Sequence, residues 1–328
     1  MKATSENLKN KKTVEADILT MVAADEYPIT SMIPTISAPG SMEFTVYSDD
    51  DGVPQMDATA ETQPVTDIEN QMENINPINI KGQWFRRSWG VSKLALKGHT
   101  FAGVKDPVAH SKMMAIKKLK REVECAILSD YPAEIQDGTK GYRTAGLGHW
   151  ISPDCEDVKN PQERTPAAQI CDTDDFNEDK LTDILDSMWE SVGADSDIIA
   201  VCGVSARGKF RDMARTDYAT TSAQHRVRVA QGTDMTITNS VMFYRGDYNK
   251  VELHTSKWIA REGKKGITDK SRNRIYMFQL KHLAKCYYQG IENMEFVNDP
   301  TGRSGVVDTI LALVCKSPKA MAKVHHDA

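Results

Sequence analysis

Side chains that could carry out chemistry are present, but their spacing matches few catalytic signatures. Ser205, in the segment GVSARG (203–208), stands at a predicted strand-to-helix turn, where a nucleophilic serine would be exposed. A helix N-cap at Ser205 is the preferred interpretation, because a serine side chain accepts from the first free backbone N–H groups. Gly146-Leu147-Gly148 lacks the third glycine and the preceding strand of a dinucleotide site. The sequence therefore predicts no catalytic residue and no cofactor.

Side chains that bind metal ions are not spaced as in a known metal motif. The eight histidines form no HExxH or HxxxH pair, and the six cysteines form no CxxC pair. Asp49-Asp50-Asp51 could hold a divalent ion, but the spacing of an EF-hand is absent, which favours a solvated loop. We predict reduced core cysteines and no metal site, and a site built from residues far apart in sequence stays open as an alternative. The cysteines are Cys125, Cys155, Cys171, Cys202, Cys286 and Cys315.

The strongest pattern in the chain is a run of negative charge followed directly by a run of positive charge. From Thr13 to Ile80 there are thirteen acidic residues and no Lys or Arg, whereas Lys81 to Arg121 holds eleven basic residues and one acid, Asp106. Each run repels itself and attracts the other, so contact between them, within a chain or between copies, stabilises both. The formal net charge of −5 conceals this pattern, which favours a self-assembling protein over an enzyme.

The basic run permits more than one partner. Trp84, Phe85 and Trp89 lie among its cations, so it could bind nucleic acid by stacking on bases. The helix expected after it needs those aromatic residues for packing, which favours a docking surface for acidic protein segments. An ordinary solvated face is the third interpretation. Non-specific contact with DNA, through this face or the basic loop 257–274, also stays open.

Length and composition limit the class of protein. A chain of 328 residues with 40% hydrophobic residues and a mean hydropathy of −0.48 can bury the core of one large domain or two ordinary ones. No apolar run is long enough to cross a bilayer, and residues 1–12 lack the apolar stretch of a secretory signal. We expect a soluble protein, made in a cytoplasm, with no membrane partner.

Alternating residues predict a long two-stranded excursion over residues 41–92. Met42, Phe44 and Val46 alternate with more polar residues, and the return strand shows one register irregularity near Gly82. The segment between the strands is acidic and free of aromatic residues, which is typical of an extended loop. Because a two-stranded ribbon is barely stable alone, we expect this one to dock on another molecule.

A long amphipathic helix is predicted after this excursion. Asp106 supplies an N-cap before a proline, and the helix stops before Pro132. Lys118–Glu122 and Lys120–Glu124 pairs are expected on its polar face. Its apolar stripe comprises Ala109, Met113, Ile116, Leu119, Val123 and Ile127.

The rest of the chain mixes helices and strands. Asn177 caps a second helix that ends at Gly193, and DIIAVCGV (197–204) is typical of a strand buried on both faces, followed by another helix. Strand candidates follow from residue 235 onward: MTITNSVMFYRG, KVELHTSKW, NRIYMFQL and SGVVDTILALVC. The predicted fold class is α+β.

Six segments follow one another along nearly the whole chain. They are ILTMVAADEYPITSMIPTI, WFRRSWGVSKLALKGH, KKLKREVECAILSD, TAGLGHWI, LTDILDSMWESVGADSDIIAV and ILALVCKSPKAMAKV. Their order and spacing resemble the major capsid protein of tailed bacteriophages, which has the Hong Kong 97-type fold. The resemblance implies an N-terminal arm, an E-loop, a P-domain with a long spine helix, and an A-domain.

The resemblance also implies boundaries for these parts. The N-terminal arm would be residues 1–40, the E-loop 41–92, the P-domain with the spine helix 93–145, and the A-domain 146–234. Residues 235–328 would interleave P-domain strands with the completion of the A-domain. Some relatives carry a coiled-coil scaffolding segment before the arm. Here the arm begins soon after Met1, which implies a separate scaffolding protein or none.

The implied function is that of a major head protein and not an enzyme. Copies would form pentamers and hexamers that assemble, through E-loop and N-arm contacts, into an icosahedral or prolate shell around double-stranded DNA. Portal, scaffolding and decoration proteins would be further partners, and the protein would be made in the bacterial cytoplasm and located in the virion. An encapsulin-like container with an enzyme cargo is the alternative. The expected assembly residues are Asp49, Asp50, Asp51, Trp84, Arg86, Arg87, Lys117, Lys118, Lys120 and Arg121.

Overall fold

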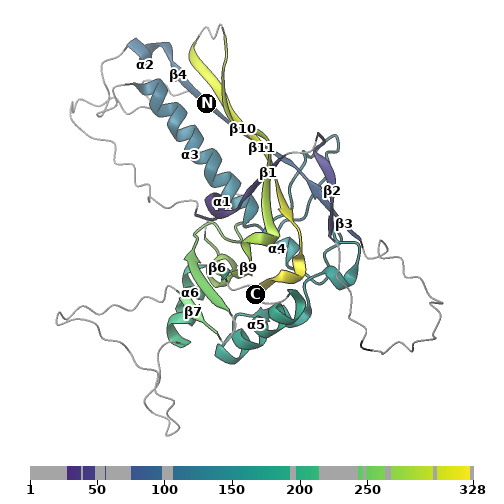
Figure 1. Ribbon diagram of the computed structural model, residues 1–328. Coiled ribbons are helices and arrows are strands. Elements are labelled where there is room, and N and C mark those ends of the chain that lie inside the picture. Colours follow the sequence, from purple (N-terminus) through teal and green to yellow (C-terminus); the bar gives the residue numbers. More distant parts are fainter. Residues whose placement is uncertain are drawn as a thin grey trace, which may run out of the picture.

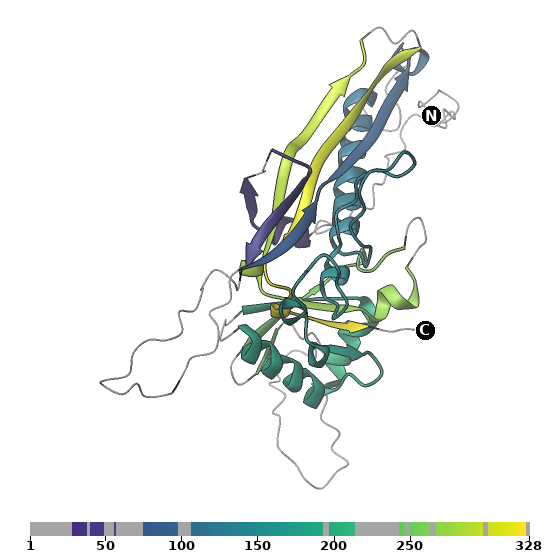
Figure 2. The same ribbon diagram turned by 90° about the vertical axis from the view of Figure 1, so that its right-hand side faces the viewer.

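The structure, a computed structural model, places the described helices and strands in an elongated upper part and a broader lower part (Figure 1). Figure 2 shows the same two parts after a quarter turn. The structure describes residues 28–37, 40–48, 56, 75–97, 106–192, 197–213, 243–246, 249–262, 267–297 and 301–325.

The upper part is a four-stranded sheet in the order β1-β10-β11-β4. β10 (Leu283–Glu295) and β11 (Gly302–Cys315) form a long antiparallel pair, and β4 (Gln83–Ser92) continues it antiparallel to β11. The short β1 (Thr35–Ser37) pairs parallel with β10. The long helix α3 (Pro107–Ile127) runs along one face of this sheet (Figure 2).

Helix α3 begins as the sequence predicts. The Asp106 carboxylate accepts hydrogen bonds from the backbone N–H groups of Val108 at 2.8 Å and Ala109 at 3.2 Å. Leu119, Val123 and Ile127 of the predicted stripe are buried, but Ala109 and Met113 are exposed. Successive residues of a helix are rotated by about 100° around its axis, so a shift of one residue changes the face. Val108 is therefore buried on the sheet side in place of Ala109. The predicted stripe is therefore right in the second half of the helix and wrong in the first.

The predicted excursion is shorter than residues 41–92. β2 (Glu43–Ser48) and β3 (Asn76–Lys81) form a two-stranded antiparallel ribbon with Glu43 opposite Lys81. The chain then turns at Gly82, whose N–H donates to the Met42 carbonyl at 2.8 Å. The strand that follows is β4, which belongs to the upper sheet. The sequence prediction treated β3 and β4 as one return strand. It could not foresee that β4 pairs with β11, which lies more than 200 residues later in the chain.

The lower part is a six-stranded sheet in the order β5-β12-β9-β6-β8-β7. Central strand β6 pairs parallel with β8 and antiparallel with β9, and helices α5 and α6 pack beside it with their own core. Its elements are β5 (Ile170–Asp172), α5 (Glu178–Val192), β6 (Asp197–Cys202), α6 (Val204–Met213), β7 (Phe243–Arg245), β8 (Lys250–Thr255), β9 (Ile275–Phe278) and β12 (Met321–His325).

Most predicted elements of this part are confirmed. The Asn177 side chain accepts from Lys180 N at 2.8 Å at the start of α5, and every residue of β6 except Asp197 is buried. Ser205 is not the N-cap of α6: it is the second helical residue and is exposed, while Gly203 O accepts the first helical hydrogen bond from Arg207 N.

The sequence did not predict β10 of the upper sheet. Of the strand predicted from residue 235, only β7 lies within the described residues.

The remaining elements are short. They are the helices α1 (Pro28–Met32), α2 (Lys93–Lys97), α4 (Leu147–Trp150) and α7 (Asp269–Asn273), and the 3₁₀ turns η1 (Pro161–Glu163), η2 (Ala167–Gln169), η3 (Leu280–His282) and η4 (Pro318–Ala320). All six cysteines are free thiols, four of them buried. Within the described ranges, no helix combines the length and the apolar character needed to cross a membrane.

Candidate assembly interface

Seven of the ten predicted assembly residues lie in the described part of the chain, on two elements. Trp84, Arg86 and Arg87 are on β4, whereas the four basic residues Lys117, Lys118, Lys120 and Arg121 are on α3. Asp49, Asp50 and Asp51 lie outside the described residues.

The residues on β4 point to opposite faces of the sheet. Side chains alternate along a strand, so Trp84 and Arg86 share one face while Phe85 and Arg87 share the other. Arg87 forms an ion pair with Glu122 of α3, which marks its face as the helix side. Trp84 and Arg86 therefore lie on the face away from α3, and the predicted basic ridge is divided between the two faces.

The face away from α3 carries a network of aromatic and charged groups. The guanidinium carbon of Arg86 lies 3.7 Å from the Trp84 ring centroid, and Trp84 is 50% exposed. The indole N–H of Trp84 donates to Asp308 Oδ2 at 3.2 Å, and Gln289 Nε2 donates to the other oxygen of Asp308 at 3.2 Å. A cation stacked on an exposed indole offers a partner both charge and apolar area.

The helix side carries more of the predicted bases than the opposite face. Lys118 and Lys120 are exposed on α3, and Lys117 and Arg121 are half-buried. The Arg87–Glu122 ion pair engages Arg87 within its own chain. Helix α3 thus carries four of the predicted basic assembly residues.

A second cationic cluster surrounds Trp258, close to the end of α3. The charged groups of Arg261, Lys257 and Arg121 lie 4.7, 5.3 and 5.9 Å from the Trp258 ring. Arg121 thus joins the basic helix to the predicted basic loop 257–274. This arrangement can contact phosphate groups or carboxylates.

The sequence did not predict how the segment before β1 is fastened. Glu124 of α3 is completely buried, and its carboxylate accepts from Ile29 N at 3.2 Å, from Thr30 N at 2.8 Å and from the Thr30 hydroxyl. Lys285 of β10 donates to the Thr30 carbonyl. Burial raises the pKa of Glu124, and the hydrogen bonds and the Lys285 charge oppose that shift only in part. The sequence prediction placed Glu124 on the polar face of the helix, which the structure contradicts.

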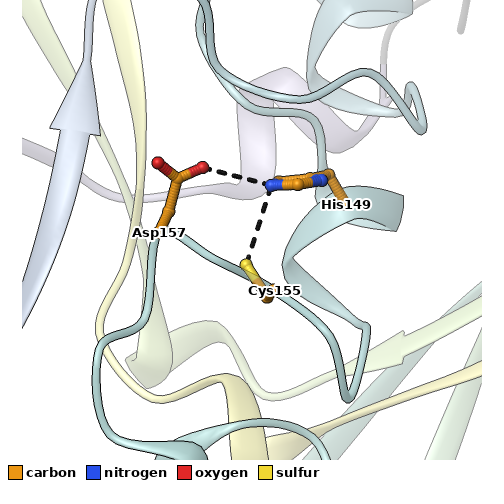
Figure 3. Close-up of side chains that lie close together, drawn as sticks. All are labelled: His149, Cys155 and Asp157. Atoms are coloured by element: carbon orange, nitrogen blue, oxygen red, sulfur yellow. Dashed lines mark hydrogen bonds and ion pairs between the residues drawn. The ribbon is translucent and has the colours of Figure 1, made fainter.

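A third group of side chains was also missed. His149, Cys155 and Asp157 lie close together beside the base of the ribbon (Figure 3), and they could hold a metal ion. Burial lowers the pKa of His149, but hydrogen bonds with Asp157 and Cys155 outweigh this effect and raise it to about 9. The only sequence signal is the spacing H-x5-C-x-D, which matches no established motif.

A polar cavity of about 520 Å³ opens between the upper and lower parts, and His149 lies in its wall. Asp130, at the end of α3, lines the same cavity and receives hydrogen bonds from Arg274 Nη2 and the Tyr276 hydroxyl, both at 2.6 Å. Burial raises the pKa of Tyr276 well above its usual value. These contacts fix the end of the helix to β9, so the carboxylate of Asp130 has a structural role.

Comparison with known proteins agrees with this architecture. The sequence profile of the SU10 major capsid protein family matches residues 4–326. No curated protein sequence matches the chain. Among solved structures, a capsid subunit of cyanophage A-1(L) is 13% identical with a TM-score of 0.62, over 98% of this chain and 97% of that one. The capsid of a native GTA particle is 10% identical with a TM-score of 0.60, over 99% and 98% of the two chains.

An encapsulin has a similar fold at a lower score. The SrpI encapsulin of Synechococcus elongatus is 10% identical with a TM-score of 0.51, over 99% of this chain and 95% of that one. These structures confirm the predicted α+β fold of the Hong Kong 97 type, and the family match confirms the predicted function as a capsid protein of the virion. The chain belongs to the SU10 major capsid protein family, the structural head proteins of tailed bacteriophages.

Proposed function

We propose that copies of this chain assemble, through the β2–β3 ribbon and the N-terminal segment, into a closed icosahedral or prolate shell of pentamers and hexamers that encloses double-stranded DNA. The observation that carries the proposal is the ribbon. Among the described residues, its strands form a regular ladder only with each other. Ile78 and Ile80 of β3 are buried in the core of the same chain, whereas no residue of β2 is buried, and a two-stranded ribbon is marginal without further contacts. Tyr47 of β2 is 68% exposed, which leaves apolar area for a neighbouring subunit.

The parts of the family fold are assigned from this geometry. We place the N-terminal arm at residues 1–40 and the E-loop at 41–81, because β4 belongs to the upper sheet. The upper sheet with α3 is the P-domain, and the six-stranded sheet with α5 and α6 is the A-domain. The late strands are divided between them, since β10 and β11 lie in the upper sheet and β9 and β12 in the lower one.

The opposed charges supply the contact between subunits. The sequence from 41 to 80 carries nine acidic residues and no base, whereas Lys118 and Lys120 of α3 are exposed. Each surface ion pair contributes about 0.2 to 1 kcal/mol, and a closed shell multiplies such contacts by its copy number. Contacts this weak also separate readily, so that misplaced subunits can leave and rebind.

A charge-swap experiment tests the proposed contact. Replacing Asp49, Asp50 and Asp51 by Lys removes the attraction, so we expect loss of particles in negative-stain electron microscopy and sedimentation. Adding Lys117→Glu, Lys118→Glu and Lys120→Glu restores opposite charges and is expected to restore particles.

The matched control is Lys180→Glu, an exposed charge reversal on α5 of the lower part. Normal assembly of the acidic-to-basic variant would show that the contact is placed wrongly. A wild-type chain that stays monomeric in every buffer, even with scaffolding and portal proteins, would contradict self-assembly altogether.

The remaining partners follow from the same role. We propose that portal, scaffolding and decoration proteins complete the head, that synthesis takes place in the bacterial host cytoplasm, and that the chain has no catalytic activity. Non-specific contact with packaged DNA is assigned to the cations around Trp258. Reversing Lys257 and Arg261 to Glu is expected to lower the amount of nuclease-protected DNA per particle without loss of empty shells.

A container for an enzyme cargo is the second candidate, and the fold shared with an encapsulin favours it. The contents of purified particles separate the two functions. Nuclease-protected DNA supports the head protein, whereas a co-purifying protein cargo with no nucleic acid supports the container.

A further inference from the structure

The side chains of His149, Cys155 and Asp157 point toward a common centre (Figure 3). His149 Nε2 lies 3.1 Å from Asp157 Oδ2 and 3.7 Å from Cys155 Sγ. One ligand atom from each residue lies within 4.8 Å of the others. An imidazole, a thiol and a carboxylate are three ligand types that zinc binds in proteins.

The spacing fits a tetrahedral ion. Zn–N and Zn–O bonds of about 2.0 Å and a Zn–S bond of about 2.3 Å place ligand atoms roughly 3.3 to 3.6 Å apart. The observed separations of 3.1 and 3.7 Å bracket that range. Two of the three separations therefore suit a tetrahedral ion, and the third, between Cys155 Sγ and the Asp157 carboxylate, lies within 4.8 Å.

The surroundings hold the three residues in place. Cys155 is completely buried, and the side chains of His149 and Asp157 are only 20% and 14% exposed. His149 is the third residue of helix α4, and its ring packs edge-on against Trp150. Val158 N donates to Cys155 O at 3.3 Å in the turn between the ligands. A mixed nitrogen, sulfur and oxygen set selects a borderline ion such as Zn²⁺ over Mg²⁺ or Ca²⁺.

Neighbouring charge and access also allow a cation. Lys81 Nζ lies 3.5 Å from Asp157 Oδ1, so the lysine and an ion on Oδ2 would share the carboxylate from opposite sides. His149 borders the polar cavity, which gives solvent and ions a route to the site. Bound water from that side can fill the fourth position.

We propose that His149, Cys155 and Asp157 bind one Zn²⁺ ion per chain and that this ion stiffens the seat of the β2–β3 ribbon. The turn that carries the ligands also holds the ribbon: Asn79 N donates to Asp157 O at 3.2 Å, and Ile78 bridges to the buried Val158. The ion would thus couple the turn at residues 155–158 to the orientation of the ribbon.

Cobalt substitution of the full-length chain tests this proposal. The chain is stripped with a chelator and titrated with Co²⁺. We expect a visible tetrahedral spectrum with a thiolate charge-transfer band that saturates at one equivalent and is lost when Zn²⁺ is added. Cys155→Ser should lose the charge-transfer band, and Cys171→Ser, at a partly buried cysteine outside the cluster, should keep it.

A second pair of variants covers the case in which Cys155→Ser does not fold. His149→Gln, at a partly exposed ligand, should weaken Co²⁺ binding at least tenfold, whereas His110→Gln on α3 should not change it. Zinc should raise the midpoint of thermal unfolding in the wild type and not in His149→Gln. Absence of the tetrahedral spectrum, or an unchanged spectrum in Cys155→Ser or His149→Gln, would overturn the proposal.

Discussion

At the scale of single residues, buried charges fasten distant segments together. The Glu124 carboxylate binds the backbone of Ile29 and Thr30, which lie 95 and 94 residues earlier in the chain. The sequence suggested a different role, because Lys120 stands four residues before Glu124 and fits a surface pair. Local spacing does not reveal a partner so far away, so this contact could not be predicted. The N-cap at Asp106 was predictable, since its donors are two and three residues away.

Glu124 should make stability depend on pH. Burial raises its pKa, so the folded chain binds this proton more tightly than the unfolded chain does. Its contribution to the free energy of unfolding is therefore present below the usual pKa and declines as pH rises through the raised pKa. Glu124→Gln should remove this decline and cost about 1 to 3 kcal/mol, because an amide has one acceptor oxygen for three donors.

Urea unfolding of the unassembled chain from about pH 4 to pH 8 measures this effect. Glu190→Gln, an exposed change on α5, is the control and should leave the pH dependence as it is. An identical pH profile for Glu124→Gln and the wild type would show that Glu124 does not titrate in this range.

Replacing Asp130 should also lower the free energy of unfolding strongly. Its carboxylate pairs with Arg274, whose side chain is 3% exposed, and accepts from the buried Tyr276. Asp130→Ala leaves a buried guanidinium without its main counter-charge, so we expect a loss of roughly 3 kcal/mol in the free energy of unfolding. Asp154→Ala, at an exposed residue of the same cavity, should cost less than about 0.5 kcal/mol. Equal losses in the two variants would refute a structural role for Asp130.

At the scale of elements, local sequence patterns predicted those helices and strands whose caps and apolar periodicity lie within the segment itself. Helices α3 and α5 and strand β6 were predicted because caps and apolar periodicity lie within each segment. Strand β10 was missed because its alternation is broken by register shifts between Tyr287 and Gln289 and between Gln289 and Glu292. The separation of β4 from the ribbon depends on its pairing with β11, which no local pattern contains.

Helix α6 offers a test of close packing at this scale. A Cβ atom on Gly203 would lie 2.3 Å from the carbonyl oxygens of Ser271 and Arg272, which are backbone atoms of helix α7. Gly203→Ala should therefore force the two helices apart and destabilise the chain by about 1 to 3 kcal/mol.

Gly208 supplies the matched control, because it lies inside the same helix and its nearest contact is the Arg211 side chain at 3.7 Å. Gly208→Ala should stabilise the chain by about 0.5 to 1 kcal/mol, since alanine has the higher helix propensity. Denaturant unfolding of both variants gives the comparison. Destabilisation of similar size at the two positions would contradict the packing argument.

At the scale of the whole molecule, the order of charge along the chain indicated contact between copies but not its geometry. From the sequence, residues 81–121 were expected to form one basic surface. The fold divides that surface, because a strand sends Arg86 and Arg87 to opposite sides and a helix covers only one of them. The predicted residues therefore form two candidate surfaces.

This division predicts unequal effects of charge reversal on assembly. A single acidic loop from a neighbour can lie on only one face of the upper sheet. We expect the helix face to receive it, because four of the predicted bases lie on α3 and two of them, Lys118 and Lys120, are exposed. On the other face Arg86 stacks on Trp84 near the Asp308 carboxylate. The pair Lys118→Glu and Lys120→Glu should raise the protein concentration needed for particle formation at least tenfold, and Arg86→Glu should change it less than twofold.

Light scattering at low and high salt measures the concentration needed for particle formation in both variants. The difference between the variants should shrink at high salt, where exposed charges are screened. The reverse order of effects would move the acidic loop to the Trp84 face.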